Sequence, residues 1–197
     1  MKRRIALLLS IVMLFSMAAC SKNNDTNNDK DQSQTQQPTG NEHTSNTDEA
    51  TTRTVTDALG REVEIPAKIE TIVPLGNTPR MISYLGLADM VVGIEECEIA
   101  SSPIQAYAYP HVEKWSALPN CGTNSMGETA YYPEQIMIAN PDVILTTDNS
   151  EVADNLQSQT GIPVVCVSQG TLFGDDYDQS LRILADVCGK RQSGNTY

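Results

Sequence analysis

Polar side chains follow directly after short apolar runs in the middle of this chain. Asn77, Thr78 and Arg80 come after one such run, and Glu95 comes after the next. In open α/β sheets, ligands bind beyond the carboxyl ends of parallel strands, where side chains of this kind converge. Amide, hydroxyl, guanidinium and carboxylate groups hold a solute by hydrogen bonds and charge. The chemistry indicated by these residues is therefore binding.

The segment 95–132 has no regular period and is rich in aromatic residues. It adds Tyr107, Tyr109, Asn124 and Tyr132 to the predicted ligand face, because tyrosine rings stack on planar chelates and their hydroxyls form hydrogen bonds. Connections this long in a compact domain are usually functional or disordered, and the aromatic content argues against disorder. A small satellite core under the loop would explain the same aromatic residues equally well.

Patterns that carry catalysis are missing from the sequence. No GxGxxG follows the first apolar run, and neither GxxxxGK[ST] nor GxSxG occurs. The two histidines, His43 and His111, form no evident Ser-His-Asp set, and a lone histidine is weak support for a haem-iron ligand. No pair of cysteines has the CxxC spacing of a zinc site. The sequence predicts a binding protein without a resident metal or cofactor, and not an enzyme.

The N-terminus has the organisation of a secretory signal peptide. Basic residues at 2–4 precede an apolar stretch at 5–17, which is too short for a comfortable transmembrane helix. Small residues then lead to Cys20. A cysteine at the cleavage point resembles a bacterial lipobox, which implies that residues 1–19 are removed and that Cys20 carries lipid. The alternative is an ordinary signal peptide with an incidental cysteine.

Residues 20–52 are predicted to form a disordered tether behind the lipidated cysteine. The segment is rich in Asn, Asp, Gln, Thr and Ser and nearly lacks large apolar residues. Such a segment cannot bury enough surface to offset the entropy lost on ordering. It would hold a folded domain close to the membrane without fixing its orientation.

The acidic balance of the chain limits its partners. The formal net charge is −12, and removal of the three basic signal-peptide residues lowers it by three, to −15. Such a chain is a poor candidate for binding nucleic acid. Around the predicted ligand face, Arg80 and Lys114 are outnumbered by Glu95, Glu96, Glu98, Glu113 and Glu128. Because a highly anionic chelate needs a basic cleft, the composition favours a neutral or cationic metal complex.

The elements that must position these residues alternate between strand and helix. We expect a hairpin at 55–57 and 62–65, buried strands at 71–75, 90–94, 142–147 and 162–167, and helices at 79–85, 133–139, 150–160 and 175–188. Thr78 and Ser150 are the predicted N-caps. The order predicts an α/β domain with a Rossmann-like parallel sheet and helices on both faces. Cys97 and Cys121 both follow strands, and a disulfide between them is possible in an exported protein.

Several segments in this order resemble one family. They are 54–63 (TVTDALGREV), 83–93 (SYLGLADMVVG), 134–144 (EQIMIANPDVI), 161–164 (GIPV) and 184–190 (LADVCGK). Together they cover nearly everything from Arg53 to Lys190. These segments resemble the substrate-binding lipoproteins of ABC importers for iron complexes and cobalamin.

The resemblance implies one lobe of a two-lobed, class III periplasmic-binding-protein fold. Residues 53–190 would form the N-terminal lobe, and 191–197 would be a truncated tail without the C-terminal lobe. The implied ligand is a siderophore, haem or cobalamin-like complex, and the implied partners are an ABC permease and its ATPase. Glu134 stands where the family has a glutamate that docks on permease arginines, although a first-turn glutamate also complements a helix dipole.

The implied location is the extracytoplasmic face of a bacterial membrane, with the lipid on Cys20 as the anchor. Two alternatives stay open at this point. The chain could be a cell-surface α/β lipoprotein that binds a macromolecule, or a non-functional fragment of a longer protein.

Overall fold

The computed structural model describes residues 51–99, 105–125 and 128–190. The predicted signal peptide, Cys20 and the tether up to residue 50 lie outside these residues, as does the segment 191–197. Within the described ranges, no helix combines the length and the apolar character needed to cross a bilayer.

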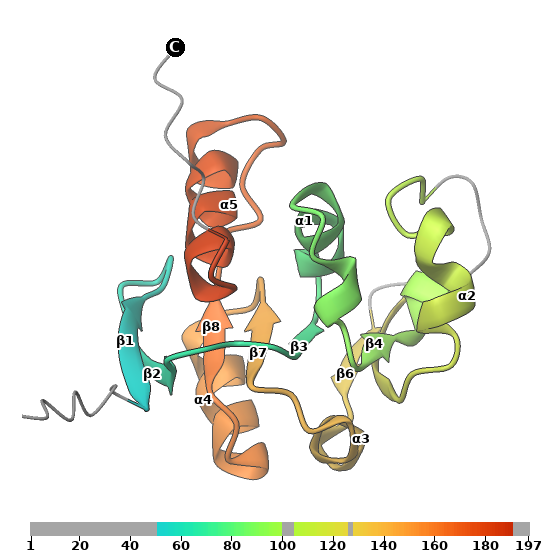
Figure 1. Ribbon diagram of the computed structural model, residues 1–197, viewed down its shortest axis with the longest axis horizontal. Helices are drawn as coiled ribbons and strands as arrows, with labels where there is room; N and C mark the ends of the chain where they lie inside the picture. Colours follow the sequence, from blue (N-terminus) through green and yellow to red (C-terminus); the bar gives the residue numbers. More distant parts are fainter. Residues whose placement is uncertain (1–50, 100–104, 126–127, 191–197) are drawn as a thin grey trace, which may run out of the picture. The chain divides into compact units, whose positions relative to one another are not determined.

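A three-stranded parallel sheet forms the centre of the domain (Figure 1). It consists of β3 (Ile72–Pro74), β7 (Val143–Thr146) and β8 (Val164–Cys166), in the order β3-β7-β8. Val73 pairs with Ile144, and Leu145 pairs with Val165. The predicted parallel sheet is confirmed.

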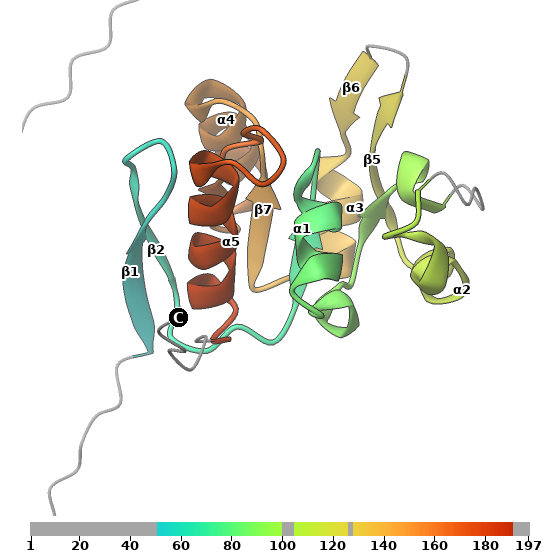
Figure 2. The same ribbon diagram turned by 90° about the horizontal axis from the view of Figure 1, so that it is seen from above.

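Helices cover both faces of this sheet, as predicted (Figure 2). They are α1 (Thr78–Tyr84) and α5 (Asp175–Val187) on one face, and α3 (Pro133–Ala139) and α4 (Ser150–Thr160) on the other. Successive strand residues alternate between the two cores. Val143 and Leu145 join the core under α1 and α5, whereas Ile144 joins the core under α3 and α4. Burial on both faces explains why these strands read as continuous apolar runs.

The helix ends agree with the sequence except at two N-caps. Asn77 occupies the N-cap position of α1, so Thr78 is its first residue and the predicted cap was wrong by one. Likewise, Asn149 and not Ser150 caps α4, because the Asn149 side chain accepts a hydrogen bond from the Val152 N–H at 3.1 Å. Left-handed glycines end three helices as expected, at Gly86, Gly161 and Gly189.

The predicted N-terminal hairpin is present beside the sheet. Its strands β1 (Thr52–Thr56) and β2 (Glu62–Pro66) are antiparallel, with Val55 opposite Val63. The Ala58 N–H donates to the Cys166 carbonyl at 3.0 Å. The hairpin therefore lies against the outer edge of β8.

The region after α1 differs from the prediction. The expected strand 90–94 is instead divided: η1 (Ala88–Met90) is a 3-10 turn, Val91 forms a single parallel bridge to Ile72, and β4 (Ile94–Glu95) belongs to a second sheet. That sheet has the order β4-β5-β6, with β5 (Asn120–Ser125) parallel to β4 and antiparallel to β6 (Glu128–Tyr131). The segment 95–132, expected to be irregular, also contains η2 (Glu96–Ile99), η3 (Tyr109–His111) and α2 (Val112–Trp115).

Candidate solute-binding site

The loops after β3 and β7 meet the end of β4 at the carboxyl edge of the strands. The Gly76 N–H donates to Oε2 of Glu95 at 2.6 Å, and the Asn77 N–H donates to Oγ1 of Thr147 at 3.2 Å. Gly76 has φ +63°, and a Cβ atom there would lie 2.7 Å from Oγ1 of Thr147. The turn after β3 therefore requires glycine, both for its conformation and for the close approach of Thr147.

Glu95 lies at the centre of this edge, and its side chain is fully buried. Burial raises the pKa of its carboxyl to about 7. The hydrogen bond from Gly76 acts in the opposite direction, whereas the nearby carboxylates of Glu98 and Asp148 raise the pKa further. Glu95 thus holds a proton far more tightly than an ordinary glutamate does.

A second group of side chains joins η2 to α1. The Tyr107 hydroxyl donates to Oε1 of the buried Glu98 at 3.0 Å. The guanidinium carbon of Arg80 lies 5.4 Å from the centre of the Tyr107 ring, within range of a cation–π contact. Burial raises the pKa of Glu98, while the Tyr107 hydrogen bond and the Arg80 charge lower it. A ring, a cation and a carboxylate are therefore combined within one cluster.

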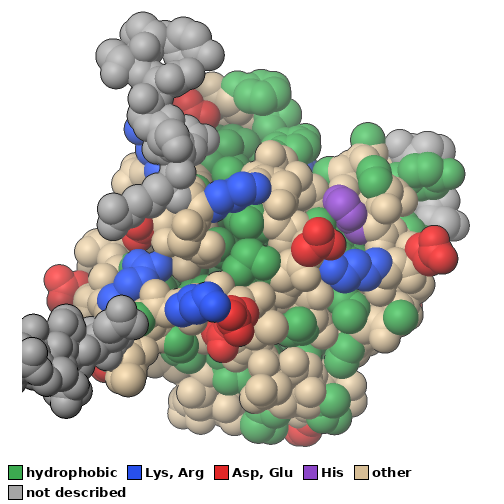
Figure 3. All heavy atoms as spheres, in the orientation of Figure 1, with side chains coloured by type: hydrophobic (Ala, Val, Ile, Leu, Met, Phe, Trp, Pro, Cys, Tyr) green, Lys and Arg blue, Asp and Glu red, His purple; other side chains and the backbone are tan. Residues whose placement is uncertain are grey.

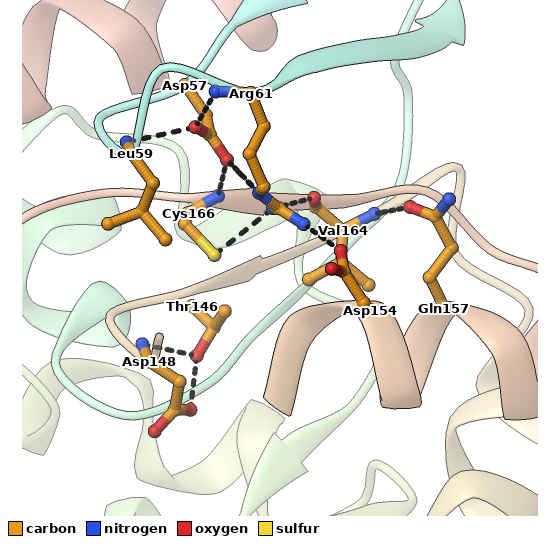
Figure 4. A network of polar contacts seen from close by, with 9 residues as sticks. All are labelled: Asp57, Leu59, Arg61, Thr146, Asp148, Asp154, Gln157, Val164 and Cys166. Atoms are coloured by element: carbon orange, nitrogen blue, oxygen red, sulfur yellow. Dashed lines mark hydrogen bonds and ion pairs between the residues drawn. The ribbon is translucent and has the colours of Figure 1, made fainter. Parts of the chain in front are cut away.

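Asp148 follows β7 and completes the acidic part of the edge. Its Oδ2 accepts a hydrogen bond from Oγ1 of Thr146 at 2.6 Å (Figure 4). The same oxygen also accepts a hydrogen bond from the Tyr131 hydroxyl. Burial and the Asp148 carboxylate raise the pKa of Tyr131. This tyrosine therefore acts as a hydrogen-bond donor at every physiological pH.

The other predicted site residues take different positions. The Thr78 side chain is buried, and its hydroxyl donates to the carbonyls of Leu75 at 2.8 Å and Leu145 at 3.2 Å. It thereby fastens α1 to the sheet. Tyr109, on η3, is 56% exposed, and the exposed Asn124 accepts a hydrogen bond from the Thr129 hydroxyl at 3.3 Å.

Tyr132 is half-buried at the N-cap position of α3. Hydrogen bonds and ring contacts between described residues connect Asn77 and Glu95 with the strand ends and connect Arg80 with Tyr107. The Asn124 backbone hydrogen-bonds the Cys97 thiol, whose sulfur lies 3.9 Å from Oε1 of Glu98. Among the described residues, the side chains of Tyr109 and Tyr132 make no hydrogen bond or ring contact with that cluster. A role for any of these residues in ligand contact stays a prediction.

Four further residues noted in the sequence have clear surroundings. Cys97 and Cys121 are both free thiols, so the structure contains no disulfide between them. The His111 ring lies 5.0 Å from the ring of Trp115, which is fully buried in the main core. Part of the aromatic content of 95–132 thus belongs to the core. Glu134 is exposed in the first turn of α3.

Sequence reasoning did not assign Glu98, Asp148 or Tyr131 to the ligand face. Asp148 directly follows a predicted parallel strand, so the strand-end rule that selected Asn77 would also have selected it. Glu98 was noted only as one charge among several. No sequence pattern assigned Tyr131 to the site, because its hydrogen-bond partner Asp148 becomes a neighbour only in the folded structure, where Tyr131 lies on β6.

Comparisons with known proteins identify the fold. Neither the protein-family models nor the curated proteins gave a match to the sequence. Among solved structures, a periplasmic solute-binding protein from Veillonella parvula matches with a TM-score of 0.56 and 26% identity, over 71% of this chain and 41% of that one. The molybdate periplasmic binding protein MolA of Haemophilus influenzae matches with a TM-score of 0.54 and 22% identity, over 70% and 47%. Helicobacter pylori CeuE with Ni(II) bound matches with a TM-score of 0.53 and 20% identity, over 70% and 43%.

The described domain has the fold of one lobe of the class III periplasmic solute-binding proteins. The chain spans less than half the length of the three proteins described above. The Veillonella parvula and Haemophilus influenzae proteins are both periplasmic binding proteins. The expected fold is therefore confirmed.

Proposed function

We propose that this chain is an extracytoplasmic solute-binding lipoprotein of an ABC importer, which captures an iron chelate or a related metal complex and delivers it to a permease. The observation that carries the proposal is the meeting of the β3, β4 and β7 loops at one edge of a solute-binding-protein lobe. Ligands of open α/β sheets bind at such an edge. The signal peptide and Cys20 support export and lipid anchoring.

The charges at this edge support a neutral or cationic complex as the solute. Glu95, Glu98 and Asp148 gather there, and Arg80 is the cation found beside them through its contact with Tyr107. A highly anionic complex would meet repulsion from these carboxylates. Tyr107 and Arg80 together offer a ring face and hydrogen-bond donors to a chelate.

A panel of three ferric complexes tests the proposal by isothermal titration with the full-length chain in detergent. The panel holds an anionic tris-catecholate, a neutral trihydroxamate and a trihydroxamate that carries one ammonium group. We expect the neutral and cationic complexes to bind and the anionic complex to bind much more weakly. Binding of the tris-catecholate alone would overturn the choice of solute charge, and failure of all three would contradict capture of an iron chelate.

Lipid anchoring is tested separately by labelling with a palmitate analogue in a bacterial host. The wild-type chain should incorporate the label, and Cys20→Ser, which removes the acceptor thiol, should not. Equal labelling of the two chains, or no labelling of either, would contradict the anchor.

A further inference from the structure

Glu95 is buried at the candidate site, and no cation of the described part of the chain forms an ion pair with it. Its side chain is 0% exposed, and Oε2 accepts the Gly76 N–H at 2.6 Å. Its other oxygen, Oε1, has no hydrogen-bond partner among the described residues, and none of the ion pairs between described residues includes Glu95. An ionised carboxylate in these surroundings is costly, so the site is poised to hold a proton.

The groups that face Glu95 from the neighbouring elements strengthen this tendency. Its titratable neighbours are Glu98 and Cys97 from η2, Asp148 from the loop after β7, Cys121 from β5 and Tyr131 from β6. All of these groups are anionic or neutral. Arg80 on α1 acts on Glu98 and Tyr107. The balance of charge around Glu95 therefore favours its protonated form.

We propose that Glu95 is a positioning residue of the candidate site, and that binding and release of its proton controls how firmly the Gly76–Asn77 turn is held. An ionised carboxylate accepts a charge-assisted hydrogen bond, which is roughly twice as strong as a neutral one. Release of the proton thus fastens the turn through the Gly76 N–H. It also adds one negative charge beneath the site.

The inference deepens the proposed function and rests on it in one respect: it ties capture of a cationic complex to proton release. A cation bound at the edge stabilises ionised Glu95, so a cationic solute should bind more tightly as the pH rises through neutrality. A neutral complex lacks this coupling. The first test below needs no solute and is therefore independent of the proposed function.

The first test follows the Gly76 amide by NMR in a full-length chain labelled with 15N-glycine. In the wild type we expect the Gly76 resonance to shift with a single midpoint near pH 7. Glu95→Gln keeps an acceptor oxygen of the same size but cannot titrate, so the shift should disappear while the chain stays folded. In the matched control Glu98→Gln, the shift should remain with a lower midpoint, because a nearby negative charge has been removed.

Two results would overturn the inference. One is a Gly76 resonance that does not move across the neutral range in the wild type, and the other is an equal movement in Glu95→Gln. If Glu95→Gln does not fold, 13C labelling of glutamate carboxyls reads Glu95 directly in the wild-type chain. A midpoint at the ordinary glutamate value of 4.5 would then refute the inference.

The second test compares the ammonium-bearing ferric trihydroxamate with its N-acetylated, neutral analogue. For the cationic complex, wild-type affinity should rise with pH, by about tenfold for each unit by which the solute lowers the pKa of Glu95. The acetylated complex, and both complexes with Glu95→Gln, should show little pH dependence. Binding of both complexes without pH dependence would refute the coupling but leave the proposed function standing. Failure of both to bind would contradict the proposed function and the coupling, and the Gly76 test would still decide the role of Glu95.

Discussion

At the scale of single residues, Asp57 shows how one buried carboxylate closes the edge of a sheet (Figure 4). Its Oδ1 accepts from the N–H groups of Leu59 at 2.9 Å and Arg61 at 3.0 Å, and its Oδ2 accepts from the Cys166 N–H at 3.2 Å. The Arg61 guanidinium bonds to Asp57 and also reaches the Val164 carbonyl at 2.9 Å. The outward backbone groups of β8 are thereby satisfied, which protects an edge strand from pairing with another chain.

We predict that Asp57→Asn lowers the free energy of unfolding by about 3 kcal/mol, because it leaves the partly buried Arg61 without its buried anion. Urea denaturation measures this change. Asp154→Asn is the matched control, since Asp154 also pairs with Arg61, at 2.6 Å, but its side chain is 67% exposed. The control should cost under about 1 kcal/mol. Equal losses in the two variants would show that burial of Asp57 is unimportant.

Glu95 makes a prediction about stability as well as about binding. The pKa of its carboxyl rises from 4.5 to about 7 on folding, so the folded state holds the proton more tightly than the unfolded chain. This contribution to stability is complete below pH 4.5 and is lost as the pH rises through 7. In the wild type, we expect the free energy of unfolding to fall by up to about 3 kcal/mol as the pH rises through this range. In Glu95→Gln this fall should be absent. Urea midpoints of both chains at acidic and alkaline pH measure the difference, and parallel curves would contradict it.

At the scale of elements, the turn between β8 and α5 carries backbone strain. Only two non-glycine residues in the described ranges have positive φ, Asn140 at 49° and Phe173 at 65°. Asparagine tolerates this conformation, whereas a bulky residue does so at a cost. The turn is held by the Gly174 N–H, which donates to the Thr171 carbonyl at 2.7 Å. The Phe173 side chain is 82% exposed, so its packing compensates little of the cost.

We predict that Phe173→Asn raises the free energy of unfolding by about 1 kcal/mol, because asparagine adopts positive φ with less strain. Leu172→Asn serves as the control in the same turn. Leu172 lacks a positive φ and is 43% exposed, so this variant should be neutral or destabilising. A thermal melt of each variant measures the effect. Equal changes in the two melting temperatures would show that side-chain polarity, and not backbone strain, decides the outcome.

Elements with strong local signals were predictable, and elements built by tertiary pairing were not. Pro133 and Asn140 bound α3 at the predicted residues, because proline fits the first helical position and asparagine adopts the left-handed end. The β5–β6 hairpin was missed. The described residues of β6 are mostly exposed, so the strand has no alternating apolar face for the sequence to reveal.

The site followed the same division. The sequence places Asn77 and Glu95 at one edge because each follows an apolar run, and the structure joins the Gly76–Asn77 turn to Glu95 through the Gly76 N–H. Their role in ligand contact stays a prediction. The prediction of one continuous strand at 90–94 was wrong, because Val91 pairs with β3 whereas Ile94 pairs with β5. A five-residue apolar run cannot reveal which neighbour each residue will find.

At the scale of the whole molecule, exposed charges of both signs lie close together. On the face drawn in Figure 3, basic and acidic side chains are neighbours, and Lys114 pairs with Asp89 at 2.9 Å. Charge on this face therefore acts mainly through local pairs of opposite sign. For the proposed permease, we therefore expect recognition of this face through particular side chains. Glu134 is the exposed carboxylate for which the sequence predicts that role.

We predict that Glu134→Arg abolishes uptake of the metal complex by cells while solute binding to the purified chain stays unchanged. Glu134 is exposed in the first turn of α3, and a carboxylate held on a helix can pair with a fixed guanidinium of the permease, which an arginine would repel. Glu151→Arg is the matched control, because Glu151 is also an exposed first-turn glutamate, on α4, and the change in net charge is the same. Uptake should survive in that variant. Loss of solute binding together with uptake would place Glu134 in the solute site. Equal loss of uptake in both variants would show that the change in net charge, and not a particular contact of Glu134, explains the effect.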